Sequence, residues 1–253
     1  MTVPCYGACS GIQGSDMERK TNSLRKRLVG AILVAWTCAG CVATNVTTAA
    51  GFSGLNAHTS ILLMPPDIKY YRVTASGITE PIAEWTAEAR TEFDSSVTAF
   101  SATHNLQLAR IEQAELSAEA AQYDQLHAAV GQTILANHYG PTPLPAKNAA
   151  FDWSLGDGVA GLAADTAEDY ALFVHYRDYQ AGGGRVGVAI FAAALGVAVY
   201  TGHQGGFASL VDLRSGDIVW FNNVPASQGD MRSPEGAQRL VKQLLADLPA
   251  TLD

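Results

Sequence analysis

Residues 25–41, with the sequence RKRLVGAILVAWTCAGC, constrain this chain most, because they decide which part of it is left to fold. Three consecutive cations precede a short apolar run that ends at Trp36, and the small residues Ala39 and Gly40 come next. A charged segment, an apolar segment and a small-residue cleavage site are the parts of a secretory signal peptide. The apolar run is shorter than the roughly 20 residues that a membrane-spanning helix needs. We therefore expect residues 1–40 to be removed.

The position of Cys41 adds a second expectation. A cysteine placed directly after the cleavage site makes the segment resemble the lipobox of bacterial lipoproteins. In that family the cysteine, here Cys41, becomes a lipidated N-terminus, so the resemblance implies anchoring in the lipid bilayer through palmitate and related acyl chains. Val42 follows, whereas an Asp at that place retains such proteins at the inner membrane in enterobacteria. The resemblance thus favours the periplasmic face of the outer membrane over the inner membrane, and an unlipidated signal is the alternative.

Removal of residues 1–40 also changes composition and charge. It takes five of the 16 Lys and Arg residues and two of the 24 Asp and Glu residues, which leaves a formal net charge of −11. Such an acidic surface argues against nucleic acid as a partner. Three of the four cysteines lie upstream of Cys41, so the mature chain has no pair to oxidise. Residues 1–16 precede Met17, a more natural start, and are interpreted as an over-extension of the reading frame.

The mature part divides into a tether and one domain. Residues 41–58 are small, polar and unpatterned, as in a flexible tether, with a poorly ordered edge strand as the alternative. Residues 59–253 suit a single domain of ordinary size, and an apolar content of 48% is ample for a core. The run from Ile61 to Met64, ended by two prolines, predicts a strand buried on both faces. A loop is expected over residues 67–77.

Helical and strand patterns alternate further along the chain. Apolar residues recur every three or four positions from a start near Thr79, which predicts a helix with one buried face. That face comprises Ile82, Trp85, Ala89, Phe93, Val97 and Phe100. Residues 106–111 alternate like a strand, and a second helix is expected over residues 113–138. Its buried stripe is predicted to comprise Tyr123, Leu126, Val130 and Ile134.

The rest of the pattern completes a layered fold. Residues 151–169 are predicted as a short helix, residues 170–176 as a buried strand, and residues 207–213 and 217–221 as a β-hairpin around a glycine-containing turn. Ser233 with Pro234 at the next position predicts the start of a final helix. The order of elements predicts an α/β domain, with α+β as the alternative. We expect a mixed sheet of about five strands with helices packed on it.

The run over residues 182–200, GGGRVGVAIFAAALGVAVY, can be interpreted in more than one way. As a helix of 15 residues from Val186 it would rise roughly 23 Å, short of the roughly 30 Å hydrocarbon core. It does not alternate apolar and polar residues as a membrane β-strand does. Bulky residues form one stripe, and alanines with Gly196 form a smooth one. The first interpretation is a buried helix, and the alternatives are an oligomer contact or a membrane-inserting element.

Motifs for catalysis are scarce. Neither a G-x-S-x-G serine elbow, an H-E-x-x-H zinc motif nor a phosphate-binding G-x-x-x-x-G-K loop occurs, and the six histidines are scattered. Residues 156–161 match the dinucleotide motif G-x-G-x-x-G, with Asp178 about 20 residues further on. The preceding residues make a poor buried strand, so we interpret these glycines as a structural helix start. We predict no catalytic residue, no metal and no cofactor.

The segment SLVDLRSGDIVWFN adds a family resemblance. With the lipobox and the opening strand ILLMPP, it resembles a pattern seen in envelope lipoproteins. Among these are the curli secretion channel lipoprotein, the lipoprotein activators of penicillin-binding proteins, and relatives with a fold like the TolB amino-terminal domain. The resemblance implies a single periplasmic α/β domain without a catalytic constellation to carry over. Ser215 and Asp217 stand where that pattern has Thr and Glu, and residues 186–200 lack the alternation of the curli channel's membrane hairpins.

These observations lead to one functional expectation and one alternative. We expect a non-enzymatic, lipid-anchored assembly or accessory factor that contacts another envelope protein or its own copies. Its expected contact residues are Val188, Phe191, Leu195, Val199 and Trp220. The alternative is a small-ligand-binding or enzymatic domain using a cleft between Gly156 and Gly161. An exposed apolar patch over residues 186–200 would favour the first, and its burial with a deep pocket beside Gly158 would favour the second.

Overall fold

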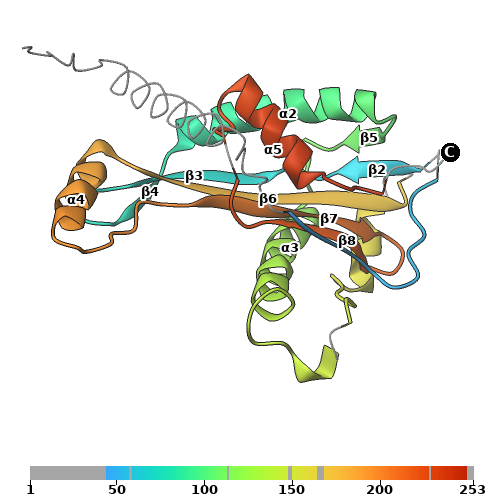
Figure 1. Ribbon diagram of the computed structural model, residues 1–253. Helices are drawn as coiled ribbons and strands as arrows, with labels where there is room; N and C mark the ends of the chain where they lie inside the picture. Colours follow the sequence, from blue (N-terminus) through green and yellow to red (C-terminus); the bar gives the residue numbers. More distant parts are fainter. Residues whose placement is uncertain are drawn as a thin grey trace, which may run out of the picture. The chain divides into compact units, whose positions relative to one another are not determined.

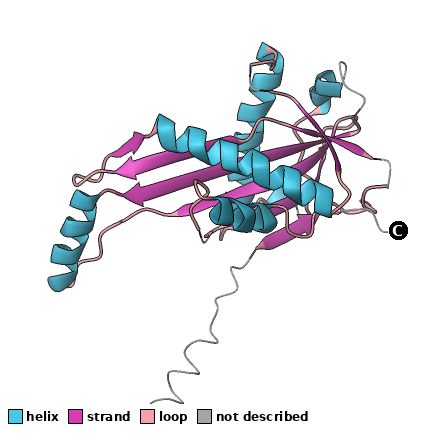
Figure 2. Cartoon of the chain, turned by 90° about the horizontal axis from the view of Figure 1, so that it is seen from above, coloured by secondary structure: helices cyan, strands magenta, loops and turns pink. Residues whose placement is uncertain are grey.

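The computed structural model describes residues 44–56, 59–112, 114–147, 150–163, 168–227 and 229–249. Within these ranges the expected α/β class is confirmed, because one mixed sheet carries helices on both of its faces (Figures 1 and 2). The strand order is β1-β8-β7-β6-β2-β5, with β3 beside β6 and β4 beside β3. The sheet of the described chain therefore has eight strands rather than about five.

The strands and helices have the following bounds. The strands are β1 (Asn45–Thr48), β2 (Ser60–Leu63), β3 (Asp67–Val73), β4 (Thr79–Pro81), β5 (Gln107–Arg110), β6 (Tyr170–Ala181), β7 (Gln204–Asp212) and β8 (Ile218–Val224). The helices are α2 (Ala83–Thr103), α3 (Ala118–Asn137), α4 (Gly183–Ala194) and α5 (Pro234–Leu244), with the short 3₁₀ helices η1 (Pro145–Lys147) and η2 (Asp157–Ala163).

The central strand β2 confirms the expectation of a strand buried on both faces. It pairs in parallel with β5 on one side and with β6 on the other, and its apolar residues are almost completely buried. The chain passes from β2 to β5 through β3, β4 and α2, and α3 lies on the connection from β5 to β6, so the two crossovers run in opposite directions along the sheet. Because such crossovers are right-handed, they place α2 and α3 on opposite faces.

One face of the sheet is covered by α2 and α5. The predicted apolar stripe of α2 is confirmed at Ala89, Phe93 and Val97, which are fully buried. Helix α5 begins as predicted, since the Ser233 hydroxyl accepts a hydrogen bond from the Gly236 backbone N–H and Pro234 is the first helical residue. Both helices pack against each other and bury the same core cluster.

The other face is covered by α3, whose predicted buried stripe is only partly right. Ile134 is buried, but Leu126 is exposed, and the residues that face the sheet include His127 and Gly131. The reason is the close approach of Phe207, since a Cβ added at Gly131 would lie 2.0 Å from a carbon of the Phe207 ring. The glycine draws this side of the helix onto the sheet and turns Leu126 toward solvent.

Several other expectations need correction. The predicted loop over residues 67–77 contains β3, which pairs along its whole length with β6. The residues expected to open the first helix, Thr79–Pro81, form β4 instead, and α2 begins at Ala83. Ile68 and Tyr70 alternate with less buried residues, but Val73 breaks the alternation and the strand carries charged residues, so the sequence did not predict a strand here. The long-range pairing with β6 makes residues 67–73 a strand.

Two segments near the sheet edge also differ from expectation. Asn45–Thr48, expected within a flexible tether, form the edge strand β1 and pair with β8. Residues 151–169, predicted as a short helix, contain an extended segment with an isolated bridge from Ser154 to Asp217, followed by η2. The hairpin of β7 and β8 is confirmed, and Gly216 has the positive φ of 77° that its turn requires.

The contact between α3 and the sheet gives a matched pair of glycine substitutions. We expect Gly131→Ala to lower the free energy of unfolding by about 1–3 kcal/mol, because the added methyl group overlaps Phe207. Gly187→Ala in α4 should raise it by about 0.5–1 kcal/mol, because nothing lies within 4 Å of the added Cβ and alanine favours helix. Denaturant unfolding of both variants measures the difference, and equal effects would contradict this packing.

Candidate functional site

The strands β3, β6 and β7 continue beyond the part of the sheet that the large helices cover. Helix α4 lies at their far end, connecting the last residue of β6 to the loop before β7 (Figures 1 and 2). We call residues 183–200 the apolar tip. They lie beyond the end of the sheet surface, so the described part of the chain offers this helix no layer to pack against.

The apolar tip is exposed, so the expectation of a buried helix there is wrong. None of the residues Gly183–Ala194 is buried. Ile190, Phe191 and Leu195 have exposed fractions of 69%, 70% and 67%. The helix also stops at Ala194 rather than continuing to Tyr200, and Gly196 turns the chain with a φ of 77°. The structure therefore favours the alternatives of an interaction surface or a membrane-inserting element.

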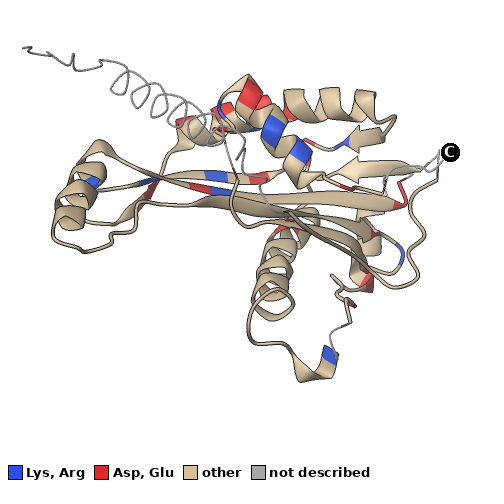
Figure 3. Ribbon diagram, in the orientation of Figure 1, with Lys and Arg blue, Asp and Glu red and all other residues tan. Residues whose placement is uncertain are grey.

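Charge is absent from most of the tip. Residues 186–202 contain no Asp, Glu, Lys, Arg or His, and Figure 3 shows this end of the molecule almost without charged residues. The cation of the first helical turn, Arg185, donates to the backbone carbonyls of Tyr200 at 2.8 Å and Ala75 at 3.3 Å. These bonds fasten both ends of the tip to the turn between β3 and β4.

Aromatic side chains gather where the tip joins the strands. The rings of Tyr71 and Tyr179 stack with centroids 4.7 Å apart, and Tyr179 stacks on His203 at 5.1 Å. The Tyr200 hydroxyl lies 2.9 Å from Nδ1 of His203. This aromatic collar, comprising Tyr71, Tyr179, Tyr200 and His203, separates the apolar tip from the polar surface of the strands. Sequence patterns did not single it out, since its members come from three distant segments.

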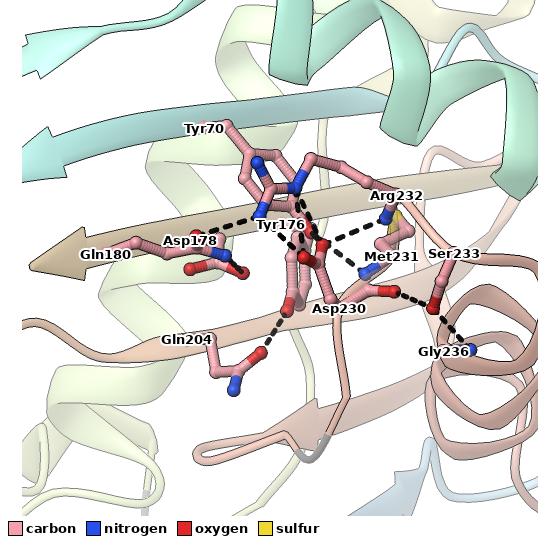
Figure 4. Close-up of polar contacts among 10 residues, drawn as sticks. All are labelled: Tyr70, Tyr176, Asp178, Gln180, Gln204, Asp230, Met231, Arg232, Ser233 and Gly236. Carbon is pink, nitrogen blue, oxygen red and sulfur yellow. Dashed lines mark hydrogen bonds and ion pairs between the residues drawn. The ribbon is translucent and has the colours of Figure 1, made fainter. Parts of the chain in front are cut away.

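A polar cluster fixes the same strands to the helical layer (Figure 4). The Arg232 guanidinium binds both oxygens of the Asp230 carboxylate, at 2.9 Å from Nε and 2.6 Å from Nη2. Arg232 also donates to Oε1 of Gln180 on β6 at 2.9 Å, and the Met231 backbone N–H donates to the Tyr70 hydroxyl on β3 at 3.0 Å. The loop before α5 is thereby tied to β3 and β6.

Asp178 is the unusual member of this cluster. Its side chain lies on β6 and is only 2% exposed, and no cation of the described chain is within ion-pair distance of it. It accepts a hydrogen bond from Gln180 at 3.3 Å. Burial raises its pKa from 3.8 to about 6, and the nearby Asp230 carboxylate adds to the shift. The Asp178 carboxylate is therefore ionised at neutral pH, and its burial in this charged form lowers the stability of the folded protein.

Other titratable groups lie under α3 on the opposite face. His127 and Ser209 form a hydrogen bond of 2.5 Å between Nε2 and Oγ, and both are almost completely buried. Burial lowers the pKa of His127 to about 3, so this histidine is neutral in the folded protein. Because neither side chain reaches a surface, the pair can join α3 to the sheet but cannot meet a substrate.

Asp67 joins β3 to β6 through two partners. Its carboxylate contacts Nδ1 of His175 at 3.0 Å and accepts a hydrogen bond from Arg177. Burial opposes ionisation, but the hydrogen bonds from His175 and Arg177 hold the pKa of Asp67 well below its usual range. His175, which lies in the predicted strand over residues 170–176, is buried and contacts Asp67 there.

The sequence-predicted contact residues separate into three groups. Val188, Phe191 and Leu195 are exposed on the apolar tip, and Val199 is half-buried there. Trp220 is a wrong prediction as a contact, since it is fully buried in the core between β8 and the helical layer. The alternation of β8 points this side chain inward. Cys41 and the expected signal peptide lie outside the described residues.

The glycine-rich segment between Gly156 and Gly161 does not form a dinucleotide site. It lies in η2, preceded by an isolated bridge rather than a parallel strand, whereas the motif requires a strand, a tight turn and a helix. A Cβ added at Gly158 would lie 2.5 Å from the Tyr123 hydroxyl, so the segment packs on α3. A hollow of about 690 Å³ near Trp153 is not lined by these glycines.

The carboxyl ends of β2 and β5 are where ligands bind in many α/β sheets. A cavity lies there, lined by Arg90, Asp94 and Arg110 among others, with a volume of about 110 Å³. This volume is below the roughly 300–1,000 Å³ of sites for drug-sized ligands and cofactors. Over the ranges that the structure describes, no cluster of three or more His, Cys, Asp or Glu side chains could hold a metal ion.

Comparisons with known proteins give weak likenesses only. No family model and no curated protein matches the chain. A PelC dodecamer from Paraburkholderia phytofirmans has a TM-score of 0.38 and 12% identity, over 83% of this chain and 99% of that one. A second PelC dodecamer from that organism gives 0.37 and 13%, over 82% and 98%. A DUF4136 family protein from Bacteroides thetaiotaomicron gives 0.30 and 9%, over 82% and 95%. With TM-scores below 0.5, these likenesses support no conclusion about this chain.

None of the helices in the described ranges is long and apolar enough to cross a membrane.

The exposure of the tip predicts that its apolar side chains do not stabilise the fold. We expect Phe191→Ser to change the free energy of unfolding by less than about 0.5 kcal/mol. Phe93→Ala should lower it by about 3–5 kcal/mol, because Phe93 is fully buried in the core. Thermal and denaturant unfolding compare the two variants, and a large loss in Phe191→Ser would show that the tip packs against the domain.

The burial of Asp178 predicts a pH-dependent stability. Its folded-state pKa of about 6 lies above the ordinary value of 3.8, so this group's contribution to stability is present at low pH and is lost as the pH rises through about 6. Asp178→Asn should therefore be more stable than the unmodified chain at pH 8, by about 1–3 kcal/mol. The difference should shrink toward pH 4, and Asp157→Asn on the exposed surface is the control. A constant difference would contradict this assignment.

Proposed function

We propose that this protein is a lipid-anchored periplasmic protein of the outer membrane that serves as a non-enzymatic assembly or accessory factor of the cell envelope. Its anchor is Cys41, and its contact segment is the apolar tip. The single observation that carries the proposal is the exposure of a large, uncharged apolar surface on a helix held away from the core. Contiguous exposed apolar patches are uncommon in monomeric proteins and are typical of interaction sites.

The energetics of the tip support an interaction role. Ile190 and Phe191 are each about 70% exposed, and neighbouring Val186, Leu195 and Val197 are exposed as well. Burial of apolar surface stabilises a complex by roughly 25 cal/mol for each Å². Arg185 and the aromatic collar hold the tip in place in the free protein, so less ordering entropy is lost on binding.

The arrangement of polar groups supports a non-enzymatic role. The pair of His127 and Ser209 is buried beneath α3. The Arg232 guanidinium is hydrogen-bonded to the Asp230 carboxylate and is therefore not free to bind a ligand. Asp67 is likewise paired with Arg177 and contacts His175. These groups join strands to a helix, to a loop or to one another, which accounts for them without a reaction.

The position of β1 supports anchoring close to the membrane. Only residues 42–44 separate Cys41 from Asn45, the first residue of β1. At no more than roughly 3.6 Å per residue, this connection spans at most about 14 Å. An acylated Cys41 would hold the sheet near the bilayer surface instead of on a long tether.

Cell fractionation tests the anchor and the accessory role together. We expect Cys41→Ser to release the protein from the outer-membrane fraction, because acyl chains supply about 0.8 kcal/mol for each buried CH₂. Crosslinking of the lipidated chain in its own membrane, followed by pull-down, should retrieve an envelope component. Continued tight membrane association of Cys41→Ser would contradict the anchor. A chain that crosslinks to no protein and to no lipid would contradict the contact role.

A further inference from the structure

The sheet register relates Asn45, the first residue of β1, to the half of β6 that leads to the apolar tip. Asn45 pairs with Asn223, Asn223 with Phe207, and Phe207 with His175, so Asn45 is level with His175 of β6. Strand β1 is antiparallel to β8, β8 to β7, and β7 to β6, so β1 runs opposite to β6. The first residue of β1 therefore lies at the end of that strand toward which β6 runs on its way to α4.

The length of β6 beyond His175 is comparable with the length of the connection between Asn45 and Cys41. Beyond the level of His175, β6 continues for six residues to Ala181, which is about 20 Å at 3.3 Å per residue. Residues 42–44 separate Asn45 from Cys41, and a connection of this length reaches at most about 14 Å. An anchor within this reach of Asn45 and a tip about 20 Å beyond His175 are close enough to meet one surface.

The distribution of apolar side chains around α4 indicates whether the tip meets a protein groove or a lipid bilayer. Successive helical residues are about 100° apart, so Val186, Ile190, Phe191 and Leu195 lie within one half of the helix circumference, and all four are exposed. After Arg185 in the first turn, the other half carries only Val188 and alanines, so the rest of the helix has no polar face. A helix that docks on a protein groove presents one apolar face, whereas a helix that is apolar all round is typical of an apolar surrounding medium.

The residues behind the tip suit the boundary of a membrane. Tyrosine rings are enriched at the membrane–water interface, and the collar of Tyr71, Tyr179, Tyr200 and His203 lies where the apolar tip ends. The exposed ion pair between Arg72 and Glu80, at 2.9 Å, follows on the neighbouring strands β3 and β4. With 12 residues, α4 is roughly 18 Å long, which is enough to enter one leaflet but not to cross the bilayer.

We propose that the apolar tip inserts into the same lipid leaflet that holds the acyl chains of Cys41, so that the domain stands on the membrane at two points. This inference rests on the proposed lipid anchor and names the partner of the tip as the bilayer. The acidic mature chain, at a formal −11, would be repelled by anionic lipids, so the insertion is driven by apolar burial and is not weakened by salt, which screens the repulsion.

A single fluorescent probe on the tip tests the insertion. Because the mature chain has no thiol besides Cys41, Ile190→Cys and Glu88→Cys each introduce one reactive site. The lipidated protein, labelled with an environment-sensitive dye and reconstituted in phosphatidylethanolamine–phosphatidylglycerol vesicles, should give a blue shift at position 190. Lipids carrying a spin-label quencher in their acyl chains should quench that signal at least twofold. The Glu88 probe, on the exposed outer side of α2, should show neither effect.

The outcomes separate the insertion from the anchor. Replacement of Phe191 by Asp in the Ile190→Cys chain should abolish the quenching while the lipidated protein stays on the vesicles. The quenching of the Ile190→Cys chain without that replacement should not weaken in 0.5 M salt. A blue shift without lipid quenching, or disulfide dimers through position 190, would identify a second copy as the occupant and overturn the proposal. Loss of vesicle binding in Cys41→Ser bears on the anchor alone, because the quenching is measured with Cys41 intact.

Discussion

The pairing of β6 with β7 is the interaction on which the rest of this structure depends. Tyr170–Asp178 pair residue by residue with Gln204–Asp212, and the opposite edge of β6 pairs first with β2 and then with β3. The two crossover helices fix the first half of β6 within a two-layer core. The second half has no helical layer over its end, yet it stays extended because backbone hydrogen bonds on both edges satisfy its polar groups. The backbone hydrogen bonds between β3, β6 and β7, rather than side-chain packing, hold the apolar tip away from the core.

Side-chain chemistry changes along β6 in step with this change of environment. Near its start, Leu172 and Phe173 pack into the cores on the two faces of the sheet. Asp178 and Gln180 follow on the α5 side and meet the loop held by Arg232. A buried carboxylate without a cation lowers stability, so its presence here shows that the strand tolerates a local penalty where many ladder hydrogen bonds hold it. The polar cluster and the collar mark the transition from core to tip.

Much of the fold could be predicted from the sequence, because local patterns agree with the final environment there. Strand β2, the stripe of α2, the hairpin of β7 and β8 and the Ser233 cap all follow this rule. The sequence-based predictions were wrong where contacts with distant segments determine the local structure. Strand β3 needs β6 as its partner, and α3 is turned by the close approach of Phe207. The tip residues were identified as a contact segment, but their exposure could not be read from an apolar run, since buried and membrane-facing helices share one composition.

The edge strand β1 has a mechanical consequence. It is joined to the rest of the domain by pairing with β8 at four consecutive positions, and it is the first element after the expected anchor residue. A load applied to Asn45 along the axis of β1 also lies along the axis of its antiparallel neighbour β8. Such a load is carried in shear by all of the ladder's hydrogen bonds together, whereas a load applied across the strands would break them one after another. The orientation of this short edge strand therefore suits it to resist a force that pulls on Asn45 along the strand.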